Sequence, residues 1–200
     1  MNTLWGILGG GFLAYLLSRK KDESPPAPSP ASVPAPPAPG MRPLTLDDYV
    51  RGCEAEAPSG SLDKATLAGF RALTPYVYLI WQVVRGEAHV RGWYRPPACN
   101  ARRGGASRSR HLAGYAVDMD FTPAQTAALV DKLQSLGAID SRKRVIAPSR
   151  WGDFVRSSLG IDENVGLKIY ASGNIHIDIG CPPGTPLCDP RTSDWLVVDV

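Results

Sequence analysis

Apolar and polar residues alternate in two short stretches of the chain, one near its middle and one near its C-terminus. In residues 115–121 the odd positions are apolar, and two of the even positions are aspartates. In residues 175–179 three isoleucines alternate with a histidine and an aspartate. Alternation with a period of two is typical of a strand that buries one face. Both stretches are therefore predicted to be strands with one apolar and one polar face.

Two polar residues of these stretches and one from the loop before them can converge on one point. If the two strands are neighbours with their apolar faces inward, Asp118 and His176 project from the same face of the sheet. Gly114 interrupts the chain before the first strand, so His111 can fold back from the preceding loop. Two imidazoles and one carboxylate with an open fourth position are typical of catalytic zinc. The alternative is that these side chains form ordinary ion pairs at a sheet surface.

The rest of the pattern predicts helices around the strands, and hence an α+β fold with a small antiparallel sheet. Residues 62–84 are largely apolar and aromatic, which predicts one or two helices, broken at Pro75. Residues 123–136 are predicted to form a helix that Thr122 caps and that ends before Gly137. Further expected features are a capped helical turn at 45–50, strands at 87–94 and 165–170, a hairpin turn at 171–174 and an Arg/Gly/Ser-rich loop at 100–109.

Composition narrows the class of protein. Two hundred residues are enough for one ordinary domain with additional segments. A formal net charge of +3 is too small to argue for a nucleic-acid partner. No internal repeat is visible, and the domain is expected to be a monomer.

The four cysteines are even in number and fit two disulfide bonds. Cys181 and Cys188 flank a Pro/Gly-rich loop that a disulfide would close, and Cys53–Cys99 would be the second bridge. Reduced, buried thiols are the alternative. A cysteine-ligated zinc site is disfavoured because no Cys-x-x-Cys pair occurs. Two disulfides would indicate an oxidising compartment.

The first alternating stretch and the loop before it resemble a known motif. Ser109, His111, Gly114, Ala116 and Asp118 match the Ser-x-His-x-x-Gly-x-Ala-x-Asp motif of the D-alanyl-D-alanine metallopeptidases, a group that also includes lysostaphin-type enzymes and the hedgehog domain. Two flanking segments are similar to further motifs of this family: residues 92–100, which resemble its Gly-Tyr-Arg-Ser-Pro…Asn segment, and residues 175–180, which resemble the Val-His-Val-Asp-x-Gly strand of the murein endopeptidases. The resemblance covers roughly residues 44–195.

The resemblance implies one zinc ion held by His111, Asp118 and His176, and hydrolysis of peptide bonds in peptidoglycan. The mildly basic chain suits an anionic wall polymer. Arg95 matches the family's arginine that is thought to bind substrate, so it is the first candidate to bind a substrate carboxylate. Ser109 is a candidate to hydrogen-bond substrate, or else it shapes the turn.

The catalytic base is the open assignment. Many family members carry an acid three residues before the second ligand histidine, where this chain has Gly173. Asp178 is the first candidate, because it shares a strand face with His176; its alternative role is to orient a ligand histidine. Asp120 is the second candidate and Glu163 the third. The chain also departs from the family at Pro96, which replaces a serine, and at an additional Trp93.

The N-terminal region is expected to be a membrane segment and a spacer. Residues 1–18 are apolar, and we interpret them as an uncleaved anchor rather than a signal peptide or a buried helix. Residues 19–43 form a Pro/Ala/Ser-rich linker of the extended, semi-rigid type, and residues 44–200 form the zinc peptidase domain. The expected localisation is a membrane-anchored domain facing the cell wall. Basic residues after the segment oppose that topology, which favours a phage virion membrane instead.

Two functions from different classes stay open. The first is a zinc peptidase that acts on stem peptides or crosslinks of peptidoglycan, as an endopeptidase or a D,D-carboxypeptidase, with a role in phage lysis or in a virion. The second is a catalytically silent relative that binds cell wall or a protein partner. The intact ligand set favours the first function, and Gly173 in place of an acid favours the second.

Overall fold

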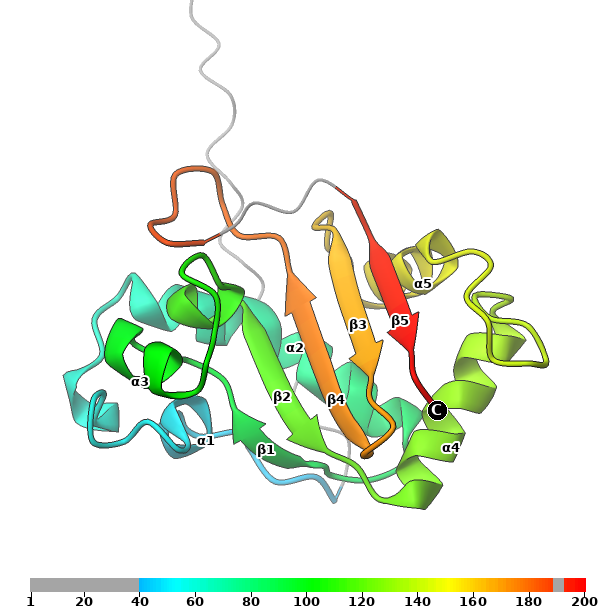
Figure 1. The fold of residues 1–200 in the computed structure, drawn as a ribbon, viewed down its shortest axis with the longest axis horizontal. Helices are drawn as coiled ribbons and strands as arrows, with labels where there is room; N and C mark the ends of the chain where they lie inside the picture. Colours follow the sequence, from blue (N-terminus) through cyan, green and yellow to red (C-terminus); the bar gives the residue numbers. More distant parts are fainter. Residues whose placement is uncertain (1–39, 189–192) are drawn as a thin grey trace, which may run out of the picture. The chain divides into compact units, whose positions relative to one another are not determined.

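A mixed sheet organises the domain, which the computed structural model describes over residues 40–188 and 193–200 (Figure 1). Within these residues the sheet has five strands in the order β1-β2-β4-β3-β5. All neighbouring pairs are antiparallel except β3 and β5, which are parallel. The predicted α+β class is therefore confirmed. The strands are β1 His89–Gly92, β2 Ala116–Asp120, β3 Val165–Ile169, β4 Asn174–Ile179 and β5 Trp195–Val198.

The two alternating stretches are neighbouring strands in this sheet, as predicted. In the register of β2 and β4, Val117 lies opposite Ile177 and Asp118 lies opposite His176. The apolar members of both strands are fully buried, whereas Asp118 and His176 are only partly buried. Figure 1 shows α2 crossing behind the sheet, where it covers one face. The sheet thus separates an apolar face toward the core from a polar face that carries the candidate chemistry.

The longest helix of the described residues, α2 (Thr66–Val83), continues through Pro75, so the predicted break does not occur. Proline in a helix interior costs about 3 kcal/mol. Burial of large side chains on both sides, including Leu73, Tyr76 and Ile80, contributes about 1.5–3 kcal/mol each and outweighs that cost.

The other helices are short. Helix α4 (Pro123–Ser135) begins with the predicted cap, a box in which Thr122 and Gln125 satisfy each other's backbone N–H groups. Helix α5 and strand β5 lie outside the predicted elements. The remaining helices are α1 Leu46–Val50, α3 Pro97–Arg102, α5 Ser149–Leu159 and the 3₁₀ turns η1 Ser59–Ser61 and η2 Arg110–Ala113.

Both predicted disulfides are present. Cys53, just after α1, is joined to Cys99 in α3, and Cys181 is joined to Cys188 across the loop that follows β4. No other cysteine occurs in the chain. The first bridge fastens α3 and the arginine-rich loop behind it to the N-terminal part of the domain.

The predicted membrane localisation is corrected here. A search of residues 40–188 and 193–200 finds no helix with the length and apolar character that a bilayer crossing requires. The apolar helix of these residues, α2, instead packs into the hydrophobic core. Anchoring of the domain to a cell or virion membrane is therefore not supported. Residues 1–18 and most of the linker 19–43 lie outside the described residues, so the domain boundaries stay a prediction.

Candidate metal centre

Three side chains from separate parts of the chain meet on the polar face of the sheet. They are His111 in η2, Asp118 in β2 and His176 in β4, and one ligand atom from each lies within 4.8 Å of the others. The rings of His111 and His176 meet edge to face, with centroids 5.2 Å apart. The donor set, two imidazoles and one carboxylate, is one that zinc binds. The group therefore fits a single divalent ion.

A tight turn brings His111 to the sheet. Gly114 ends η2 with φ +76°, a left-handed conformation that other residues rarely adopt. A Cβ atom at Gly114 would lie only 1.7 Å from the Tyr49 hydroxyl. The Trp93 indole N–H donates to the Gly114 carbonyl at 2.8 Å and holds the turn from the other side. Glycine is thus required at this position for both its conformation and its size.

The backbone selects the tautomer of His111. Its Nδ1 lies 2.7 Å from the Trp93 carbonyl oxygen, which can only accept a hydrogen bond. Nδ1 therefore carries the proton, and the lone pair of Nε2 faces Asp118, whose Oδ1 is 3.4 Å away. Burial lowers the pKa of His111, and the Asp118 carboxylate beside the ring offsets this shift only in part, so the ring is neutral. Neutral imidazole is the form that binds a metal.

Asp118 is surrounded by positive and hydrogen-bonding groups. His176 Nδ1 lies 2.7 Å from Asp118 Oδ1, and Arg95 forms an ion pair with Asp118 Oδ2. Burial alone would raise the pKa of Asp118, but the contacts with His111 and His176 outweigh it and hold the pKa far below its usual range. The carboxylate is thus charged and available as a ligand at any physiological pH.

His176 lies between two carboxylates. Its Nδ1 meets Asp118, and its Nε2 lies 3.3 Å from Asp178 Oδ2. Burial would lower the pKa of His176, but the hydrogen bonds of Asp118 and Asp178 raise it to about 9. In the absence of a metal the ring therefore holds a proton, which supplies the positive charge that these carboxylates attract.

Asp178 is buried beside the group, with 2 % of its surface exposed. Arg110 Nη1 lies 3.6 Å from Asp178 Oδ2, and the Trp195 ring stacks on His176 with centroids 6.0 Å apart. Since His176 Nε2 faces away from Asp118, a carboxylate at that nitrogen is placed to orient the ring. This geometry favours the orienting role of Asp178 over that of a base.

Three other predicted site residues lie outside the group formed by His111, Asp118 and His176. Ser109 accepts a hydrogen bond from the His111 N–H at 3.3 Å and so shapes the turn. Asp120 is on the correct strand face but pairs with His89 and Arg91, at 3.3 and 3.7 Å. Glu163 is exposed and accepts from the backbone N–H of Asp162. None of these three residues is in the group that could hold the ion.

A comparison with protein-family models finds one similar family. The model described as Peptidase M15 matches residues 88–143 of this chain. This segment holds β1, the Arg95 loop, η2 and β2, and therefore two of the three clustered residues, His111 and Asp118. Residues 88–143 are therefore similar to the M15 peptidases. No curated protein sequence matches it.

M15 peptidases are zinc-dependent metallopeptidases, which agrees with the ligand group described above. His176 lies outside the matched segment. Its assignment depends instead on its register opposite Asp118 and on the shared polar face. The family match thus supports His111 and Asp118 as ligands, and the pairing of β2 with β4 supports His176.

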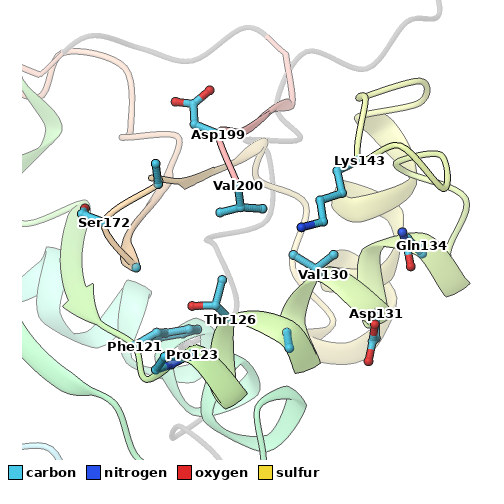
Figure 2. Close-up of a pocket in the computed structure, with 13 residues that line it drawn as sticks. Phe121, Pro123, Thr126, Val130, Asp131, Gln134, Lys143, Ser172, Asp199 and Val200 are labelled. Carbon is cyan, nitrogen blue, oxygen red and sulfur yellow. The ribbon is translucent and has the colours of Figure 1, made fainter.

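Gly173, at the position where many family members carry an acid, lies in the turn between β3 and β4. It adopts φ +82° and lines a cavity of about 640 Å³. Figure 2 shows this cavity between α4, which carries Thr126 and Val130, and the C-terminal Val200. None of the predicted site residues lines it. The turn between β3 and β4 therefore offers no acid at the position where many family members carry one.

Three residues near the group are not among the predicted metal ligands or catalytic residues. The Trp93 carbonyl orients His111, Arg110 approaches Asp178, and Trp195 stacks on His176. In the sequence, Trp93 is noticeable only as an additional residue within the segment 92–100 that resembles the family's Gly-Tyr-Arg-Ser-Pro…Asn motif. Trp195 carries no sequence signal, because it reaches the site through β5, whose parallel pairing with β3 no local pattern indicates.

Proposed function

We propose that this chain is a zinc peptidase that hydrolyses amide bonds in the peptides of peptidoglycan. The observation that carries the proposal is the convergence of His111, Asp118 and His176, whose ligand atoms lie within 4.8 Å of one another. The M15 relationship supports a peptidase in general.

The residues of the chain have separate roles in this proposal. His111, Asp118 and His176 hold the ion, and Asp178 orients His176 through Nε2. When bound, zinc polarises the scissile carbonyl and lowers the pKa of a coordinated water towards about 7. Arg95 holds Asp118 from the side opposite the histidines and so keeps that carboxylate in place.

Metal analysis combined with digestion of purified muropeptides tests the proposal. The wild-type chain should retain one zinc and release peptide products that disappear with a chelator. His176→Ala should lose both the zinc and the products. His89→Ala is the matched control, because His89 is exposed and pairs with Asp120 outside the group. A His176→Ala protein that retains zinc and still digests muropeptides would contradict the proposal.

A catalytically silent relative that binds cell wall or a protein partner is the second candidate. The observation that favours it is Gly173 in place of an acid, with no other acid from that turn facing the group. Retention of zinc without any chelator-sensitive product would identify this function. Binding of the zinc-loaded chain to insoluble peptidoglycan would then be the activity to measure.

A further inference from the structure

A cavity of about 340 Å³ adjoins the metal-ligand group and is lined by three arginines. They are Arg91 on β1, Arg95 in the loop after β1, and Arg103 at the end of α3. Asp118 lines the same cavity and is also a member of the ligand group. A molecule in this cavity would therefore contact the site where the proposed ion binds.

Gly92 allows two of the guanidinium groups to approach each other. It lies at an irregularity in the pairing of β1 with β2, opposite Asp118. A Cβ atom on Gly92 would be 3.2 Å from Arg103 Nη1 and 3.2 Å from Arg95 Nη2. Both cationic groups thus lie over the same glycine, and a side chain there would push them apart.

The positive charge of this cavity is only partly balanced. Arg95 pairs with Asp118, while Arg91 lies 3.7 Å from Asp120. Arg103 donates to the Gly52 carbonyl at 3.1 Å, and no carboxylate of the described residues lies within 4.0 Å of it. Burial, followed by the charge of Arg95, lowers the pKa of Arg103, in keeping with the closeness of the two guanidinium groups over Gly92. Such a cluster favours an anionic ligand.

We propose that Arg103 and Arg91 form a subsite for a carboxylate of the peptide substrate, next to the bond that is cut. The inference rests on the proposed function for the identity of the substrate. Planar guanidinium groups bind carboxylates through paired hydrogen bonds, which gives both affinity and orientation. The carboxylate is either the C-terminal group of the peptide or the side-chain group of a residue such as diaminopimelate.

Binding of defined peptides to the zinc-loaded full chain tests this subsite. The probes are N-acetyl-lysyl-D-alanyl-D-alanine with a free C-terminus, its C-terminal amide, and a stem peptide with diaminopimelate in place of lysine. Arg103→Gln should weaken binding of the carboxylate probe about tenfold and leave binding of the neutral analogue unchanged. Arg91→Gln should act in the same direction. Arg102→Gln is the matched control, because Arg102 pairs with Glu56 outside the cavity.

The outcomes separate this inference from the proposed function. If only the diaminopimelate peptide responds to Arg103→Gln, the subsite takes the side-chain carboxylate. If Arg103→Gln and the wild type bind every probe equally, or if the wild type binds none of them, the subsite is wrong, even where zinc content and hydrolysis are intact. If the variant lowers carboxylate binding while no peptide is hydrolysed, the subsite stands and the peptidase proposal fails.

Discussion

The carboxylate of Asp178 meets the nitrogen of His176 that faces away from Asp118. An orienting carboxylate typically raises metal affinity by 10–100-fold. Asp178→Asn should therefore lower zinc affinity by about 10–100-fold, and much of the lost turnover should return at saturating zinc. Competition with a chromophoric chelator gives the affinity. Asp120→Asn, on the same strand face but paired with His89, should leave the affinity unchanged.

The alternative role of Asp178 gives the opposite result. A general base contacts the reacting groups rather than the metal ligand, so its loss lowers kcat without changing metal affinity. Asp178 is therefore the base if Asp178→Asn leaves zinc affinity unchanged and excess zinc does not restore its turnover. This pair of measurements therefore decides a question that strand periodicity alone left open.

Asp48 carries a second prediction at the scale of single residues. The residue is fully buried in α1, and Arg42 and Arg51 donate to its carboxylate at 2.6–2.9 Å. Burial would raise the pKa of Asp48, but the hydrogen bonds from Arg42, Thr45 and Arg51 outweigh it and hold the pKa well below 3.8. The charged carboxylate therefore stabilises the fold above about pH 4, and this contribution is lost as the pH falls below that value.

Asp48→Asn should lower the free energy of unfolding at pH 7 by about 1–3 kcal/mol, the usual contribution of hydrogen bonds between charged groups. The difference from the wild type should shrink below about pH 4, because the Asp48 carboxylate of the unfolded wild-type chain then takes up a proton, which favours unfolding. Urea denaturation at pH 7 and at pH 3 measures both effects. The exposed neighbour Asp47 is the control, since Asp47→Asn should change stability by less than about 0.5 kcal/mol.

At the scale of elements, the turn at Gly114 connects the fold to the site. Gly114→Ala would introduce both a strained backbone and a collision with the Tyr49 hydroxyl. It should destabilise the protein by about 1–3 kcal/mol and weaken zinc binding, because the turn that aims His111 must shift. Gly104→Ala is the control, because Gly104 has φ +68° with nothing within 4 Å of its Cβ position. Equal losses in both variants would mean that backbone strain alone matters.

The parts of this fold that follow from local pattern were predictable. Alternation identifies β2 and β4 and places Asp118 and His176 on one face, because one buried face imposes the period of two. The capping residues of α4 mark its start in the same way. Tertiary effects were not predictable: α2 continues through Pro75 because burial outweighs the cost of proline, and β5 joins the sheet through a distant parallel pairing. The carbonyl that orients His111 belongs to the backbone and leaves no trace in residue type.

At the scale of the whole molecule, the two disulfides differ in how much chain they close. Cys53 and Cys99 are 46 residues apart, whereas Cys181 and Cys188 are 7 apart. Because a crosslink stabilises chiefly by restricting the unfolded chain, the longer loop should contribute about 4 kcal/mol and the shorter about 2 kcal/mol. The longer bridge also fastens α3, whose end carries Arg103 of the proposed carboxylate subsite.

Paired substitutions separate these two contributions. Cys53→Ala with Cys99→Ala should lower the free energy of unfolding by more than Cys181→Ala with Cys188→Ala, as measured by urea denaturation of the metal-free chains. The first pair should also weaken binding of a carboxylate peptide, while zinc affinity changes little, because η2, β2 and β4 hold the ligands without this bridge. The second pair should leave peptide binding unchanged, which makes it the control. Larger destabilisation from the second pair would show that native packing around the bridges, rather than loop length, determines their contribution.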